Sequence, residues 1–157
     1  METVFSKSKK ENLVKNNSRG FSLLELLIVV AIILIIATIA IPSLLRSRQS
    51  ANETAAVATM KQINTAEVTY SSAAQNFYGT MTELVSAGFL DSSLTATKSG
   101  YNYVVSLSTD RLDYTAYATA NSPTMGRYDY YTSPDYVIRY TTDSTRAPGS
   151  LAGEPVR

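Results

Sequence analysis

A run of twenty residues without a charged side chain, residues 26–45, constrains this 157-residue chain more than any other feature. At about 1.5 Å of rise per residue, a helix of that length spans about 30 Å, which is the thickness of the hydrocarbon core of a bilayer. The sequence therefore predicts a hydrophobic helix over residues 21–45 that can cross a membrane.

The segment before this helix, residues 1–20, is polar and basic. Its five cations outnumber its two acids, a net charge of +3, whereas the rest of the chain has nine basic and eleven acidic side chains, a net charge of −2. Cationic flanks stay on the cytoplasmic side, so we expect residues 1–20 in the cytoplasm and the C-terminal part in the periplasm. The mildly acidic body argues against nucleic acid as a direct partner.

Glu25 is the residue that the possible interpretations of this hydrophobic segment must explain. An ordinary secretory signal peptide has a shorter apolar core, followed by a small-residue cleavage site that is missing here. A plain membrane anchor fits the length but does not need Glu25, whose carboxylate costs up to about 2.5–3.5 kcal/mol at mid-membrane and less near the edge. Glu25 therefore either lies close enough to the interface to reach water or pairs with a cation inside the lipid. A free amine at Phe21 would supply that cation if the chain were cut after Gly20.

Residues 20–33 read GFSLLELLIVVAII, and this segment resembles the processing site and N-terminal helix of type IV pilins. The resemblance implies that a membrane peptidase cuts after Gly20 and methylates the new N-terminal Phe21. It also implies that Glu25 recruits an incoming subunit by pairing with its terminal amine. Ser22 stands where this family often has Thr, and Pro42 matches a proline common in these helices.

The resemblance implies a structural subunit, made as a precursor and polymerised into a helical filament for adhesion, motility or DNA uptake. The implied partners are other copies of the chain and other pilins, the prepilin peptidase and methyltransferase, the pilus assembly platform with its ATPase, and inner-membrane lipids. The subunit would span the inner membrane once before assembly and lie in an extracellular pilus afterwards. Two alternatives stay open: a type II secretion pseudopilin, and a membrane-anchored periplasmic binding domain that does not polymerise.

Pro42 lies inside the predicted helix. It lacks an N–H group and crowds the carbonyl of Thr38, which costs about 3 kcal/mol in a helix interior and bends or breaks the helix. We expect either a kink at Pro42 or, as the resemblance implies, local melting of this region on assembly.

Residues 46–78 continue as an amphipathic helix, and the two parts together could form one helix of about 80 Å. This region is rich in Ala, and its apolar residues recur at helical spacing. The predicted stripe consists of Ala56, Met60, Ile63, Ala66, Tyr70, Ala73 and Phe77. We expect one helix face to dock on a sheet.

Residues 79–157, here called the head, predict an α+β fold with an antiparallel sheet of about four strands packed on the long helix. A short helical turn at residues 82–85 precedes two hairpins. The first joins residues 101–108 to 112–120, and the second joins residues 127–132 to 136–141 around a Ser-Pro-Asp turn. Residues 121–126 form a loop, and the tail after Thr142 is irregular.

The composition narrows the chemistry that the chain can perform. It has no Cys and no His, which excludes zinc sites built from these residues and Ser–His or Cys–His catalysis. The sequence contains neither an acidic calcium loop nor a Gly-rich phosphate loop. We therefore expect a non-enzymatic protein without metal or cofactor.

Overall fold

The computed structural model describes residues 20–141 and 154–156, so the predicted leader except Gly20 and most of the predicted irregular tail lie outside the described residues. The chain divides into two compact units, an N-terminal unit up to Ile39 and a C-terminal unit from Ala40 onward.

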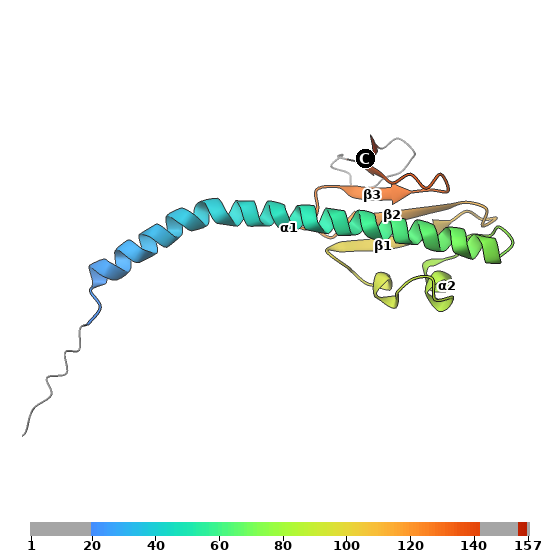
Figure 1. The fold of residues 1–157 in the computed structure, drawn as a ribbon. Coiled ribbons are helices and arrows are strands. Elements are labelled where there is room, and N and C mark those ends of the chain that lie inside the picture. Colours follow the sequence, from blue (N-terminus) through green and yellow to red (C-terminus); the bar gives the residue numbers. More distant parts are fainter. Residues whose placement is uncertain (1–19, 142–153, 157) are drawn as a thin grey trace, which may run out of the picture. The chain divides into compact units, whose positions relative to one another are not determined.

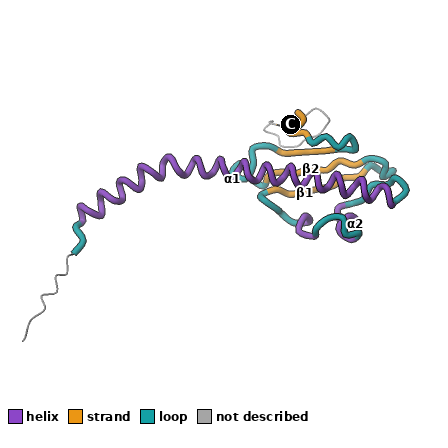
Figure 2. Tube along the Cα trace, in the orientation of Figure 1, coloured by secondary structure: helices purple, strands orange, loops and turns teal. Residues whose placement is uncertain are grey.

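One helix, α1 (Leu23–Ala73), contains 51 residues and runs through Pro42. It contains no Gly, and its second half is rich in Ala, the residue with the highest helix propensity. The helix ends where Gln75 and Asn76 take positive φ angles of 55° and 69°, a left-handed conformation that commonly terminates helices. Figure 2 shows α1 as the longest regular element of the described chain.

The C-terminal unit contains one antiparallel sheet in which neighbours in sequence are also neighbours in space, β1-β2-β3-β4-β5. Its strands are β1 (Tyr101–Leu107), β2 (Tyr114–Ala120), β3 (Asp129–Thr132), β4 (Arg139–Thr141) and the short β5 (Glu154–Pro155). The first two strands form one hairpin and β3 with β4 forms the other, which confirms both predicted hairpins.

The core of this unit lies between α1 and the sheet, as Figure 1 shows. From the helix, Ala56, Met60, Ile63 and Ala66 are buried, and β2 contributes a buried row of Tyr114, Ala116, Ala118 and Ala120. Small alanines line both sides of this core, and buried tyrosines of the sheet fill the space between them. The fold is therefore the predicted α+β arrangement of a long N-terminal helix on an antiparallel sheet.

Two short helices connect α1 to the sheet, α2 (Met81–Ser86) and η1 (Ser92–Thr95). The side chain of Thr80 accepts a hydrogen bond from the Glu83 N–H, and the Glu83 carboxylate accepts one from the Thr80 N–H. This capping box fixes the start of α2. The short turn expected near residues 82–85 is thus a capped helix, whereas η1 was not predicted.

The predicted apolar stripe is correct only in part. Ala56, Met60, Ile63 and Ala66 are buried and Tyr70 is half-buried, but Ala73 is exposed and Phe77 lies beyond the end of the helix with 42% of its surface exposed. The left-handed residues at 75 and 76 turn the chain away, so helical spacing no longer applies at Phe77.

Candidate functional site

The predicted processing site lies just before α1. Gly20, Phe21 and Ser22 precede the first helical residue, and the Leu26 N–H donates to the Ser22 carbonyl at 3.1 Å. Phe21 is 73% exposed and Gly20 is also exposed. The peptide bond between Gly20 and Phe21 is thus in non-helical, exposed backbone, the kind of segment that a peptidase can bind.

Glu25 lies in the first turn of α1. The first four N–H groups of a helix have no partner within it, so a carboxylate is favoured at this end by the helix dipole. Glu25 is exposed, and among residues 20–141 and 154–156 no ion pair or hydrogen bond to its side chain is found. Its carboxylate is therefore available to a group from outside this chain.

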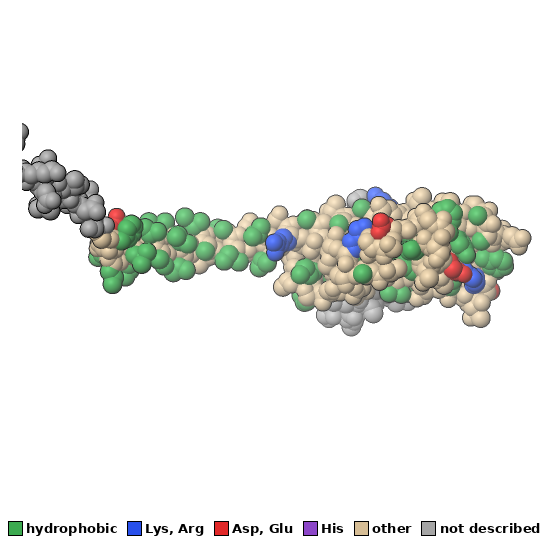
Figure 3. All heavy atoms as spheres, turned by 90° about the horizontal axis from the view of Figure 1, so that it is seen from below, with side chains coloured by type: hydrophobic (Ala, Val, Ile, Leu, Met, Phe, Trp, Pro, Cys, Tyr) green, Lys and Arg blue, Asp and Glu red, His purple; other side chains and the backbone are tan. Residues whose placement is uncertain are grey.

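Apolar side chains surround the N-terminal part of α1. Leu, Ile and Val side chains from Leu23 to Leu45 are exposed, and Figure 3 shows hydrophobic side chains over this part of the helix. By length and composition, α1 can cross a membrane, and none of its most apolar 18-residue window is buried within the protein. This surface requires lipid or other protein chains to cover it.

Pro42 stands inside this exposed stretch, where it cannot donate to the carbonyl four residues earlier. That carbonyl belongs to Thr38, whose own hydroxyl donates to the Ile35 carbonyl at 2.7 Å. The structure retains helical backbone on both sides of Pro42, and both expected effects of this residue, a kink or local melting, stay predictions.

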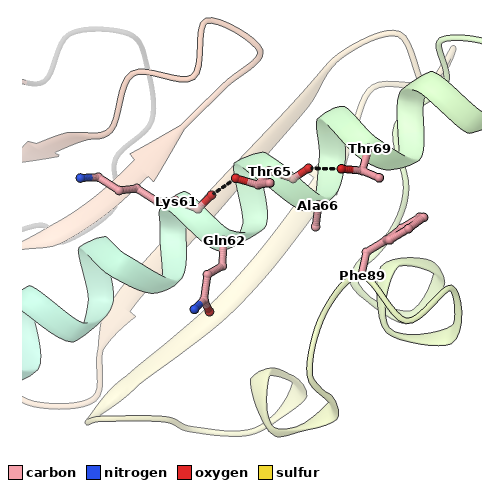
Figure 4. A pocket seen from close by; sticks show the side chains of 6 residues that line it. All are labelled: Lys61, Gln62, Thr65, Ala66, Thr69 and Phe89. Atoms are coloured by element: carbon pink, nitrogen blue, oxygen red, sulfur yellow. Dashed lines mark hydrogen bonds between the residues drawn. The ribbon is translucent and has the colours of Figure 1, made fainter.

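A groove on the C-terminal unit is a second candidate site. Figure 4 shows it between α1 and Phe89, lined by Lys61, Gln62, Thr65, Ala66, Thr69 and Phe89. The hydroxyls of Thr65 and Thr69 donate to helix carbonyls one turn earlier, at 3.0 and 2.8 Å. They are thus occupied within the helix and do not converge on the groove.

Among the polar residues that α1 buries, Glu53, Asn64 and Glu67 were not predicted from the sequence. Asn64 donates to the Thr132 hydroxyl at 3.0 Å and accepts from the Tyr114 hydroxyl at 2.9 Å. Their spacing of 11 and 3 residues places them on the stripe of Met60 and Ile63, a signal that could have identified them.

Glu53 anchors the loop before β3. Its carboxylate accepts from the Arg127 backbone N–H at 2.8 Å and from the Arg127 guanidinium at 3.0 and 2.8 Å. Burial alone would raise the pKa of Glu53, but these hydrogen bonds and the positive charge outweigh it and hold the pKa below the ordinary 4.5. The pair is structural, since both groups already satisfy each other.

Within the described residues, no group of three or more acidic side chains lies where it could hold a metal ion. The predicted functional residues lie together at the start of an apolar helix, with Gly20 and Phe21 in exposed backbone just before it and Glu25 in its first turn.

Comparison with known proteins bears on this same segment. The family model of the prokaryotic N-terminal methylation motif matches residues 15–41. A stretch of 42 residues is 55% identical to the type IV wide pilus major component PilA4 of Thermus thermophilus, and it covers 27% of this chain and 32% of that protein. The chain thus spans about a third of the length of this relative. No solved structure matches the chain.

Proposed function

Because the N-terminal segment of this chain is type IV pilin-like and carries the N-terminal methylation motif, we propose that the chain is the precursor of a structural subunit of a type IV pilus. It is cut after Gly20, methylated at Phe21 and polymerised through its apolar helix. The observation that carries the proposal is a carboxylate, Glu25, in the first turn of an apolar helix whose side chains are exposed.

Cleavage changes the charge at the start of α1. The leader with its net charge of +3 is removed, and a new amine is created at Phe21, four residues before Glu25. An uncompensated carboxylate in a hydrocarbon environment is costly, and an amine of a neighbouring subunit neutralises it. The pair thus favours assembly in which each incoming amine reaches the Glu25 of a subunit already present.

The apolar helix explains why register needs such a pair. When Leu, Ile and Val side chains exchange lipid for neighbouring helices, the hydrophobic contribution nearly cancels, because lipid tails are as apolar as these side chains. Packing and the single charged pair then distinguish one register from another. Specifying the register of packed helices is the best-attested role of buried charged pairs.

Under this proposal, each segment of the chain has a role. Residues 1–20 are the cytoplasmic leader, residues 21–45 the membrane and later filament-core helix, residues 46–78 the amphipathic helix, and residues 79–157 the periplasmic and later extracellular head. The prepilin peptidase and methyltransferase process the precursor, and the assembly platform and ATPase add it to a filament for adhesion, motility or DNA uptake. Pro42 lies where the helix can bend or melt as it leaves the bilayer.

The test replaces Glu25 with Ala in the full-length precursor. We expect surface fibres to be lost or sharply reduced, counted by electron microscopy, while the membrane fraction retains a normal amount of the protein. Ser22→Ala is the matched control, because it removes a polar group from the same turn without removing the charge, and it should leave fibres at the wild-type level. Wild-type numbers of fibres from the Glu25→Ala variant would refute the proposed pairing.

A further inference from the structure

Glu67 is a buried carboxyl group without a cation bound to it. It lies in the second half of α1 with 0% of its surface exposed. Its Oε2 accepts a hydrogen bond from the Gly79 N–H at 3.0 Å, whereas Oε1 is buried and has no hydrogen-bond partner among the described residues. An ionised carboxylate in such a place is costly, and a protonated one much less so.

The hydrogen bond to Gly79 ties α1 to the segment that follows it, residues 74–80, here called the connecting segment. The segment is closely fitted, since a Cβ added at Gly79 would lie 3.1 Å from the ring of Tyr70 and 3.2 Å from Leu84. The N–H of the neighbouring Tyr78 donates to the Arg111 carbonyl, the Tyr78 carbonyl accepts from the Arg111 guanidinium, and the Tyr78 ring lies 4.7 Å from that of Tyr114. Glu67 is thus enclosed by the segment that it holds.

The charged and titratable groups around Glu67 come from three further elements. Arg111 from the β1–β2 turn is a cation that acts on Glu67, but its guanidinium donates to the Tyr78 carbonyl at 2.9 Å and to the Glu83 carboxylate of α2 at 2.5 Å. Tyr78 of the connecting segment and Tyr114 of β2 also interact electrostatically with Glu67.

Only Glu67 in this group changes charge near neutral pH. Burial raises the pKa of Glu67 from 4.5 to about 7, against the opposing effects of the Gly79 N–H and of Arg111. A backbone hydrogen bond from Thr80 holds the pKa of Glu83 below its ordinary value, and burial raises the pKa of Tyr78 to about 12. Burial also raises the pKa of Tyr114, and hydrogen bonding to Glu83 raises that of Arg111.

We propose that Glu67 is a proton-operated latch for the connecting segment. While the carboxyl is protonated, residues 74–80 stay closed over α1. When it ionises, the charge is better solvated with the segment open, so the segment opens more often and its exposed Phe77 moves with it. The latch belongs to the C-terminal unit alone and does not depend on filament assembly.

The direction of the effect follows from linkage. Because the pKa of Glu67 is raised in the closed state, closing takes up a proton, and closure is favoured fully below pH 4.5 and lost as the pH rises through about 7. With values of about 7 closed and 4.5 open, the equilibrium between closed and open forms falls about thirtyfold between pH 5.5 and 8.5.

Hydrogen–deuterium exchange with mass spectrometry, on the full chain in detergent micelles, measures this equilibrium. Exchange is corrected for the intrinsic effect of pH, and peptides from residues 74–80 are compared with peptides from β2. We expect the protection of the segment to fall about thirtyfold from pH 5.5 to 8.5, while that of β2 stays constant. In Glu67→Gln the protection of the segment should not change with pH, because the amide keeps the shape but cannot ionise.

A matched control is Glu83→Gln, which removes a carboxylate that also binds this region, at the Thr80 N–H, and should retain the pH dependence. A pH-independent wild type, or an equal fall in Glu67→Gln, would overturn the proposal. If Glu67→Gln does not fold, carbon-13 NMR of the Glu carboxyl groups in the wild type decides: a Glu67 midpoint near 7 supports the latch, and a midpoint near 4.5 overturns it.

Discussion

Removing the guanidinium of Arg127 tests how the head is held on α1. In Arg127→Ala, the Glu53 carboxylate, only 7% exposed, retains the backbone N–H of residue 127 but loses both bonds to the guanidinium. Breaking a fully buried pair by removing one partner costs about 3–5 kcal/mol. The Arg127 side chain is 54% exposed, so water partly screens the pair, and we expect a loss of about 2 kcal/mol.

The assay is thermal unfolding of the full chain in detergent, followed by circular dichroism. A loss of about 2 kcal/mol corresponds to a fall in Tm of about 4–8 °C for a chain of this size. Adding Glu53→Gln to Arg127→Ala should restore part of the loss, because the double variant no longer buries an unpaired charge. Arg48→Ala is the control, since Arg48 is exposed and no ion pair to it is found among the described residues.

The same pair has a defined pH dependence. Because the pKa of Glu53 is lowered in the folded protein, its stabilising contribution is present above the ordinary pKa and is lost as the pH falls through the folded value. The Tm difference between wild type and Arg127→Ala should therefore shrink at acidic pH. A difference no larger than that of Arg48→Ala at neutral pH, or one that does not shrink in acid, would refute this reasoning.

Two further predictions concern processing and packing. Intact-mass spectrometry of fibre subunits should show a chain that starts at N-methylated Phe21. The Gly20→Leu variant should retain the 20-residue leader and run as a heavier band on a gel. Cleavage of this variant at the wild-type rate would contradict the assignment of the processing site. Gly126→Ala should lower the free energy of unfolding by about 3 kcal/mol, because the added Cβ would lie 2.0 Å from the Tyr101 hydroxyl. That hydroxyl donates to the Tyr128 carbonyl at 2.8 Å, so moving it aside also breaks this hydrogen bond. At Gly88, φ is +76° and a Cβ would meet nothing within 4 Å, so Gly88→Ala should lower the free energy of unfolding by only about 1 kcal/mol. Both free energies are measured by unfolding in urea. Equal losses from the two variants would contradict the packing argument.

The parts of the fold that follow from local pattern could be predicted from the sequence. Alternating residues at 101–108 and 112–120 predicted the first hairpin, and the structure pairs Tyr101 with Ala120 and Leu107 with Tyr114. The spacing of Ala56, Met60 and Ile63 predicted the buried face of α1. These patterns succeed because burial on one face imposes a period of 2 on strands and 3.6 on helices.

Features that depend on distant contacts could not be predicted in this way. Phe77 continues the apolar spacing, but the backbone turns at Gln75 and Asn76. The spacing of Glu67 places it on the buried stripe of α1, but the sequence does not show that residues 74–80 enclose its carboxyl group. Arg127 pairs with a carboxylate 74 residues away, a distance at which the sequence pattern carries no information about pairing.

At the candidate functional site, the sequence predicted the residues, and the structure of a single chain adds little about their chemistry. Gly20, Phe21 and Glu25 were predicted from the resemblance of residues 20–33 to type IV pilins, and the isolated chain adds that Phe21 is exposed and that Glu25 lies in the first helical turn. Their proposed chemistry takes place between subunits, so a single chain places the two halves of the pair at one exposed end but does not contain the pair.

Electron cryomicroscopy of purified surface fibres, at a resolution that shows side chains, tests the central claim most directly. The proposed function predicts a fibre core of packed apolar helices in which the amine of Phe21 from one subunit lies within hydrogen-bond distance of the Glu25 carboxylate of a neighbour. Fibres in which that carboxylate faces water, with no amine beside it, would contradict the account.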